Sequence, residues 1–181
     1  MIKKENLKDL YPLSPMQEGM LFQSLLNPQE TIYHQQVTYS LEGDIDPAVI
    51  ERTWQSLFLR HDILRTVFIA EKVKRPLQAV LHNLQGGFSY LDLSGQDAHT
   101  IEPSVIQALA KDKALGFDLK SAPLMRLTLI RRSQEKYTLI WSHHHILMDG
   151  WCVGIILGDF MALYQAHKNG TVCTLPTPPR Y

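Results

Sequence analysis

The sequence predicts an α/β (α+β) fold, a two-layer sandwich in which helices pack on a mixed β-sheet. Three observations lead to this fold class. Segments in which apolar and polar residues alternate, as in strands, are interspersed with segments that repeat apolar residues every three or four positions, as in helices. Proline and glycine separate these segments, and the last helix follows directly on a buried strand. With 181 residues, the chain is long enough to form a sizeable core.

The first helix is expected to begin after a short charged segment, residues 1–13, which we interpret as a linker or a docking segment. Residues 14–17 read Ser-Pro-Met-Gln. The serine can cap a helix, proline suits the first helical position, and Gln17 completes a capping box. The helix should end near Leu26, because Asn-Pro follows.

A strand and a second helix are expected next. Between residues 37 and 41, apolar Val, Tyr and Leu alternate with Thr and Ser, the pattern of a half-buried strand. Asp46-Pro47 then starts a helix that should end near Arg60. Its apolar face is formed by Ile50, Trp54, Leu57 and Phe58.

Arg65 lies in an apolar run, residues 64–69, that we expect to be a strand. A guanidinium buried there without a partner would cost several kcal/mol. Asp149 is a candidate partner. We therefore predict an ion pair between Arg65 and Asp149, which would make Asp149 architectural and not a proton shuttle.

The middle of the chain adds short strands and a third helix. The helix should extend from Pro103 to Leu115, with Gly116 as its C-terminal cap. Four short apolar runs read as strands, the last two as a hairpin: Leu77–Leu81, Phe88–Leu91, Leu124–Arg131 and Lys136–Ser142.

The most informative segment is residues 142–151, Ser-His-His-His-Ile-Leu-Met-Asp-Gly-Trp. It follows a predicted buried strand and precedes a helix that should extend from Gly150 to Asn169. One face of this helix repeats apolar residues: Val153, Ile156, Leu157, Phe160, Met161 and Tyr164. The histidines therefore lie at a strand-to-helix corner, where side chains and helix N-terminal amides can converge on a ligand.

Several interpretations of this corner stay open. If the strand persists, His143 and His145 share a face and His144 points the other way. A neutral imidazole can act as a general base, but one or two of these histidines could equally be satisfied core residues. A zinc site is disfavoured, because no His-Glu-x-x-His or paired-cysteine spacing is present. Asp149 could also cap the helix, and Gly150 either admits a ligand or only makes a turn.

Composition narrows the function classes. Hydrophobic residues make up 45% and charged residues 20%, which is typical of globular proteins. With 18 Lys and Arg against 18 Asp and Glu, no net charge favours nucleic acid or an anionic membrane surface. No apolar run is long enough to span a bilayer. Cys152, expected to be buried, and Cys173 should be free thiols, and without a secretory leader we expect a cytoplasmic protein.

Three motifs in order resemble those of nonribosomal peptide synthetase condensation domains. Residues 144–151, His-His-x-x-x-Asp-Gly-Trp, resemble the core motif of that family. Residues 13–21 and 60–68, Leu-Ser-Pro-Met-Gln-Glu-Gly-Met-Leu and Arg-His-Asp-Ile-Leu-Arg-Thr-Val-Phe, resemble its first two motifs. The resemblance implies a chloramphenicol-acetyltransferase-like fold of two lobes. Residues 14–175 would be the N-terminal lobe, and residues 176–181 would begin the linker to a C-terminal lobe that this chain lacks.

The resemblance also implies a function. Condensation domains are ligase-type acyltransferases of cytoplasmic multienzymes in antibiotic biosynthesis. They join an upstream aminoacyl or peptidyl thioester to the amine of a downstream aminoacyl thioester. Donor and acceptor peptidyl carrier proteins present both substrates on phosphopantetheine arms, so no directly bound cofactor and no metal are expected. By position, His145 would be catalytic, as a base or as a positioner. Site support would come from His144, Asp149, Arg65, Gly150 and Trp151. The isolated lobe should be inactive.

Some positions refine the resemblance. Gly19 stands where many family members carry arginine. The Gln-Glu-Gly-Met-Leu and Asp-Gly-Trp-Cys variants resemble domains that accept a D-configured donor. Trp151 directly after Gly150 argues against an epimerisation domain, and the retained histidine pair argues against a heterocyclisation domain. Residues 1–13 resemble a docking segment, which would bind a C-terminal helix of an upstream synthetase near residues 1–26.

Two other functions remain as alternatives. The chain could be an interaction module that binds carrier or docking partners without chemistry. It could also be a free-standing acyltransferase of the same fold that uses a soluble thioester such as coenzyme A.

Overall fold

Two β-sheets form the framework of the computed structural model, which describes residues 4–27 and 30–178. The larger sheet has the strand order β2 (His34–Glu42), β7 (Lys136–His144), β6 (Met125–Arg131) and β5 (Gly87–Asp92). The smaller sheet has the order β1 (Leu7–Pro12), β4 (Leu77–Leu81) and β3 (Thr66–Ile69). Strands β5 and β6 are parallel and the other pairs of these strands are antiparallel, so the predicted mixed sheet is confirmed.

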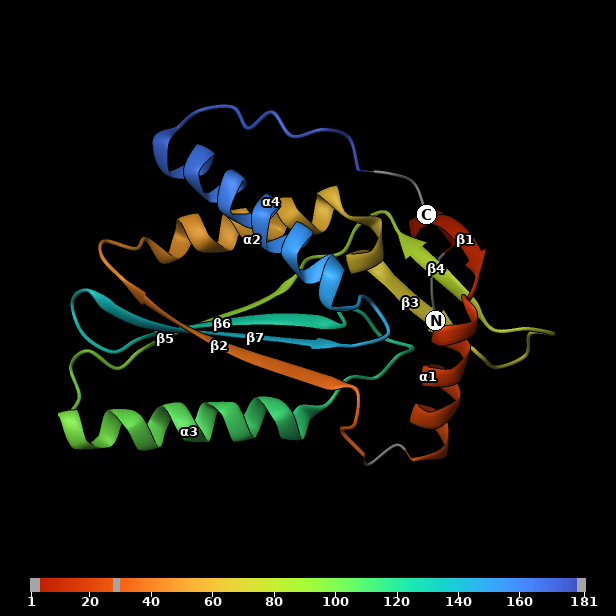
Figure 1. Ribbon diagram of the computed structural model, residues 1–181, viewed down its shortest axis with the longest axis horizontal. Coiled ribbons are helices and arrows are strands. Elements are labelled where there is room, and N and C mark those ends of the chain that lie inside the picture. Colours follow the sequence, from red (N-terminus) through yellow and green to blue (C-terminus); the bar gives the residue numbers. More distant parts are fainter. Residues whose placement is uncertain (1–3, 28–29, 179–181) are drawn as a thin grey trace.

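Helices cover both faces of the larger sheet (Figure 1). Helices α2 (Pro47–Arg60) and α4 (Gly150–Asn169) lie on one face and α3 (Ala98–Leu115) lies on the other. The arrangement therefore has three layers instead of the expected two. The reason is that β6 and β7 bury both of their faces. On one face, Leu127 and Trp141 belong to the same core cluster as Trp54 and Phe58 of α2. On the other face, Ile140 packs toward α3.

Local capping fixes the helices much as the sequence predicts. Helix α1 (Pro15–Leu26) has the predicted bounds, and its capping box forms: Ser14 Oγ accepts from Gln17 N at 3.3 Å, and Gln17 Oε1 accepts from Ser14 N at 3.0 Å. Helix α3 begins at Ala98, five residues before the predicted start, and contains Pro103. A proline removes a single backbone hydrogen bond, which the rest of a long helix tolerates.

Two segments near the N-terminal half differ from the predictions. Residues Asp62–Arg65 form a short 3-10 helix, η2, so the predicted strand 64–69 begins only at Thr66. The segment Leu7–Pro12 forms β1, which pairs with β4, although the sequence pattern indicated only a linker or docking segment. The segment shows no apolar–polar alternation, because β1 is an edge strand with mostly exposed side chains. Residues 1–3 of that segment, Pro28 after α1, and residues 179–181 of the predicted linker lie outside the described residues.

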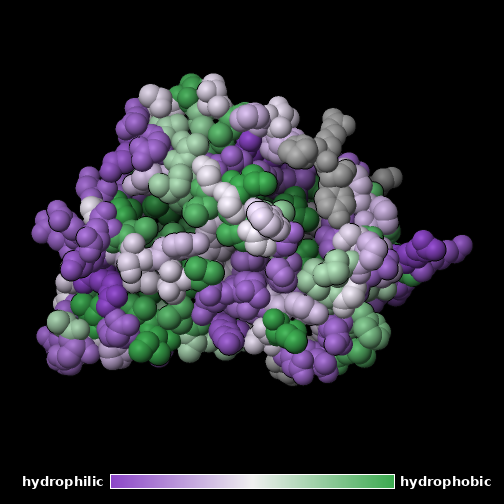
Figure 2. Space-filling model, in the orientation of Figure 1, coloured by the Kyte–Doolittle hydropathy of each residue, from purple (hydrophilic) through white to green (hydrophobic). Residues whose placement is uncertain are grey.

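A charged loop projects between β3 and β4 (Figure 1). Figure 2 shows this projection as mainly hydrophilic, and Glu71, Lys72, Lys74 and Arg75 are exposed. Charged tips of this kind discourage edge-to-edge association of the small sheet. Within the described chain, no helix has the length and apolar character needed to cross a bilayer.

Candidate active site

The strand-to-helix corner after β7 is held by its backbone. His144 N donates to Leu124 O at 3.0 Å, and His145 N donates to Tyr33 O at 2.8 Å. Inside the corner, Leu147 N donates to His144 O at 3.1 Å and Met148 N to His145 O at 3.3 Å. The side chains of residues 146–148 are all buried in the main core. This combination of anchored backbone and buried side chains gives the residue at position 145 a defined direction.

The three consecutive imidazoles lie in different environments. His143 and His144 are buried, with 5% and 7% of their surface exposed, whereas His145 is half-buried. The interpretation as a satisfied core residue therefore holds for His144. His143 is also buried, but its Nδ1 has no hydrogen-bond partner among the described residues. His144 Nδ1 accepts a hydrogen bond from Ile146 N at 3.1 Å, and its Nε2 lies 3.4 Å from Ser24 Oγ. The His144 ring thus supports the corner, and His145 is the imidazole that reaches solvent.

Burial keeps the two inner histidines neutral. Desolvation is the main cause that lowers the pKa of His143 and of His144 from 6.5 to about 4. Neighbouring histidines add a smaller contribution in the same direction. A neutral His144 can accept from Ile146 N, which a protonated ring could not do.

These pKa values predict that stability decreases under mildly acidic conditions. In the unfolded chain these histidines bind protons below about pH 6.5, but in the fold only below about pH 4. The unfolded state therefore binds more protons in this window, and the free energy of unfolding should fall by up to about 1.4 kcal/mol per pH unit per histidine.

Urea denaturation at pH 7, 6 and 5 measures this effect. His144→Gln should reduce the slope of stability against pH, whereas His99→Gln, at an exposed position on α3, should leave the slope unchanged. Equal stability of the unsubstituted protein at pH 7 and pH 5 would contradict the neutral, buried state of these rings.

The N-terminus of α4 presents an open surface beside His145. Asp149 is exposed, and its Oδ1 accepts from Cys152 N at 3.0 Å, so it caps the helix. This backbone hydrogen bond is the main cause that lowers the pKa of Asp149. A Cβ at Gly150 would meet no atom within 4 Å, and Trp151 is 89% exposed. Cys152 is also exposed, so the prediction of a buried thiol is wrong.

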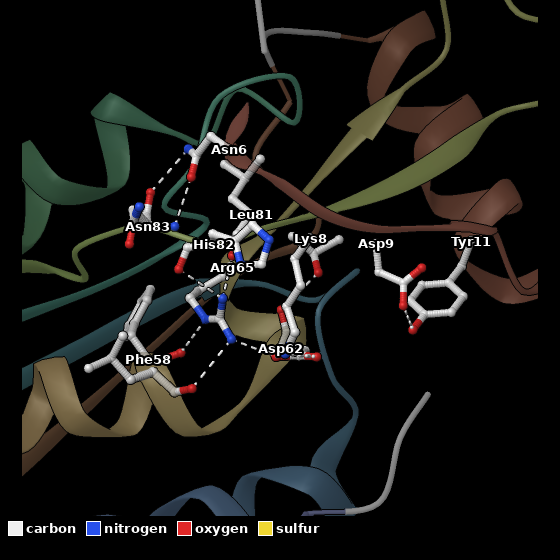
Figure 3. Close-up of polar contacts among 12 residues, drawn as sticks. Asn6, Lys8, Asp9, Tyr11, Phe58, Asp62, Arg65, Leu81, His82 and Asn83 are labelled. Carbon is white, nitrogen blue, oxygen red and sulfur yellow. Dashed lines mark hydrogen bonds and ion pairs between the residues drawn. The ribbon is translucent and has the colours of Figure 1, made fainter. Parts of the chain in front are cut away.

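Arg65 does not pair with Asp149, so that prediction is wrong. Figure 3 shows its guanidinium surrounded by carbonyl groups and Asp62. The five N–H donors of the side chain all have acceptors: Phe58 O at 2.8 Å, Leu59 O at 3.3 Å, Leu81 O, His82 O at 3.2 Å and Asp62 Oδ1 at 2.5 Å. Arg65 therefore caps the last turn of α2 and ties it to the end of β4. The reason for the error is that a buried arginine can be satisfied mainly by backbone carbonyls.

Sequence reasoning missed other groups that hold the corner. The carbonyl of Tyr33 anchors His145, and Gln17 Nε2 donates to Ile146 O at 3.3 Å. Gln78, in turn, contacts Gln17. A sequence signal was available only for Gln78, which is the polar residue within the otherwise apolar run Leu77–Leu81.

The corner combines groups suited to acyl transfer. A half-exposed imidazole can accept or orient the proton of an attacking amine. The first backbone N–H groups of α4 carry partial positive charge that can stabilise a developing oxyanion nearby. Among the described residues, no three His, Cys, Asp or Glu side chains are grouped so that they could hold a metal ion.

The sequence of the chain matches a known family across nearly its whole length. A family model described as "Condensation domain" matches residues 7–181. The chain belongs to the condensation domain family. The motifs at residues 13–21, 60–68 and 144–151 therefore fall in a condensation domain, as their resemblance indicated.

Relatives of this condensation domain segment are parts of peptide synthetases. It is 44% identical over 173 residues to a component of the linear gramicidin synthase of Brevibacillus parabrevis, covering 93% of this chain and 3% of the relative. It is 41% identical over 177 residues to tyrocidine synthase 2 of the same organism, covering 97% of this chain and 5% of the relative. The chain therefore spans only a small part of the length of these relatives.

Solved structures confirm the fold. The starter condensation domain of the rhizomide synthetase RzmA matches with a TM-score of 0.83 and 24% identity. The match covers 92% of this chain and 41% of that structure. The first condensation domain of the calcium-dependent antibiotic synthetase, solved with a substrate analogue, matches with a TM-score of 0.83 and 19% identity, covering 94% and 42%. The expected chloramphenicol-acetyltransferase-like lobe is confirmed.

Proposed function

We propose that this chain is the N-terminal lobe of a condensation domain that forms an amide bond between two carrier-bound substrates. The donor is an aminoacyl or peptidyl thioester and the acceptor is the amine of a second aminoacyl thioester. The observation that carries the proposal is the placement of His145. It is the solvent-reaching imidazole of the family's core motif, on a corner whose backbone is anchored at Tyr33 and Leu124.

The reaction requires mainly that the two substrates are aligned and that the proton of the attacking amine is transferred. The acceptor amine attacks the thioester carbonyl, the new C–N bond forms, the C–S bond breaks, and the donor arm leaves as a thiol that receives the proton lost by the amine. Because a thioester is already activated, the domain gains most by holding the amine in line. In this proposal His145 orients the amine and contacts its proton, and the positive end of α4, whose Cys152 N already donates to Asp149, contributes only through its dipole to stabilising the tetrahedral oxyanion.

The other predicted site residues act in support. His144 holds the corner through Ile146 N, and Asp149 caps α4 through Cys152 N. Arg65 acts at a distance, by fixing the end of α2. Gly150 and the exposed Trp151 belong to the open surface that a second lobe would cover. Because this chain covers 41% and 42% of the two solved condensation domains, we propose that the missing lobe completes the site and that the single lobe is inactive.

Partners follow from the same proposal. Donor and acceptor peptidyl carrier proteins would deliver the substrates on phosphopantetheine arms in the cytoplasm. An upstream C-terminal helix could dock near residues 1–26, but β1 would have to keep its pairing with β4, in which Asp9 to Pro12 are in register with Val80 to Leu77.

An assay of the complete domain with two loaded carrier proteins tests the proposal. The expected product is a dipeptide thioester on the acceptor carrier, detected by mass spectrometry of its phosphopantetheine arm. A donor arm loaded with a D-amino acid should react faster than its L-counterpart if the Gln-Glu-Gly-Met-Leu motif marks a D-donor subtype. Binding of both carriers without any amide would instead favour the interaction module. Equal turnover with a coenzyme A thioester as donor would favour the free-standing acyltransferase.

A further inference from the structure

Two buried glutamines lie behind the catalytic corner. Gln17 of α1 is 6% exposed and Gln78 of β4 is 1% exposed. Their side-chain amides form a reciprocal pair, in which the Nε2 of each donates to the Oε1 of the other at 3.3 Å. Two amides are rarely buried together without a structural reason, because each needs several hydrogen bonds to offset its desolvation.

Gln17 connects this pair to the corner. Its Nε2 also donates to Ile146 O at 3.3 Å, and Ile146 directly follows His145. Its Oε1 also accepts from Ser14 N at 3.0 Å. The bond to Ile146 is therefore a side-chain contact that reaches from α1 across to the backbone of the corner.

Gln78 and Ser14 N together determine which way the Gln17 amide faces, because Ser14 N can only donate to Gln17 Oε1. The Nε2 of Gln78 donates to Pro12 O at 3.1 Å, and a carbonyl can only accept. The Oε1 of Gln78 must consequently face Gln17, which requires the NH2 group of Gln17 on that side. The same orientation directs this NH2 group at Ile146 O. A reversed Gln17 amide would place two oxygens against each other at Ile146.

We propose that Gln78 is a positioning residue for His145: it orients the Gln17 amide, which holds the Ile146 carbonyl and so fixes the direction of the His145 side chain. The inference rests on the proposed function, in which His145 orients the acceptor amine. No sequence motif considered above includes Gln78. Its direct contact with the groups that hold the corner is through Gln17.

Gln78→Met, which keeps the side-chain length without the amide, tests this inference in the complete domain. We expect kcat to fall by about tenfold or more with KM changed less than about twofold, because misplacing a reacting group slows the chemical step. Gln55→Met is the matched control. Gln55 also makes two amide hydrogen bonds, to Gly86 O at 3.0 Å and from Gly86 N at 2.8 Å, but in α2 away from the corner. A kcat for Gln78→Met as high as that of Gln55→Met, below both melting temperatures, would overturn the inference.

A double substitution separates positioning from general stability. If Gln78 acts through Gln17, Gln17→Met combined with Gln78→Met should lower kcat no further than Gln17→Met alone. Multiplied losses in kcat would show independent roles and overturn the inference. Should Gln78→Met fail to fold, Gln78→Asn takes its place with the same expected result, because it stays neutral and polar but is one methylene group shorter.

An NMR measurement that does not depend on turnover distinguishes a failure of this inference from a failure of the proposed function. The carbon-13 resonance of His145 Cε1 should shift or broaden in Gln78→Met and stay unchanged in Gln55→Met. An unchanged resonance in Gln78→Met would overturn the positioning role even if the domain forms amides. Full activity of His145→Ala would instead remove the proposed function, while the resonance would still report whether Gln78 orients the ring.

Discussion

Replacing His145 by alanine is expected to lower the kcat of the complete condensation domain by about 10²- to 10⁴-fold. The imidazole is the solvent-reaching ring of the corner, and alanine removes its contact with the amine and its proton. Carrier-protein binding should stay unchanged, because the backbone of residue 145 still donates to Tyr33 O. Single-turnover formation of the dipeptide thioester, measured beside carrier affinity, checks both parts of this prediction.

The substituent at position 145 distinguishes a base from a positioner. His145→Asn keeps a hydrogen-bonding side chain that cannot take up a proton near neutral pH. Substantial residual activity in this variant would indicate a positioner, whereas a loss equal to that of alanine would indicate a base. His99→Ala, an exposed histidine on α3, controls for the loss of an imidazole elsewhere. Undiminished product from His145→Ala would contradict the catalytic assignment.

Arg65→Met should lower the free energy of unfolding by about 3–5 kcal/mol. The substitution removes five hydrogen bonds at once and leaves the carbonyls of Phe58 and Leu81 in a buried setting without these donors. An unsatisfied buried polar group costs about 1–3 kcal/mol, so several together account for the expected loss. Typical domains have only about 5–15 kcal/mol of stability, so the variant should be close to unfolding.

Urea denaturation of the complete domain measures this loss. Arg65→Lys should fall between the methionine variant and the unsubstituted protein, because lysine keeps the charge but cannot reproduce the planar fork. Arg75→Ala, at an exposed position in the β3–β4 loop, should change stability by less than about 0.5 kcal/mol. Charge reversal at both Arg65 and Asp149 should not restore stability. Rescue by that double reversal would contradict the five-bond arrangement of Arg65.

Most helices could be predicted from the sequence because the residues that start and end them are close together in the chain. The Ser14–Gln17 capping box, the Asp46-Pro47 start and the end of the last helix at Asn169 each depend on residues within one helical turn, and α1, α2 and α4 have nearly the predicted bounds. The placement of the histidines at a corner was equally local, since strand β7 and helix α4 flank it directly. The family motifs were also recognisable because they are contiguous segments.

Other features depend on contacts between distant segments. Strand β1 mixes charged and apolar residues without a regular pattern, and its pairing is fixed by β4, which follows about seventy residues later. The three-layer arrangement depends on which face of the sheet each helix covers. Burial of His143 and His144, in contrast to His145, depends on neighbours from β2, α1 and the loop before β6.

The sequence by itself determined the boundaries of α1, α2 and α4, the corner with its three histidines and the family, because these are properties of short contiguous segments. Only the tertiary structure decided what each polar side chain contacts. From charge alone, we predicted a carboxylate as the partner of Arg65. A buried guanidinium needs only enough hydrogen-bond acceptors around it, and here most of these acceptors are backbone carbonyls. Backbone groups are identical at every position, so no residue letter marks them, and only the folded chain brings them together.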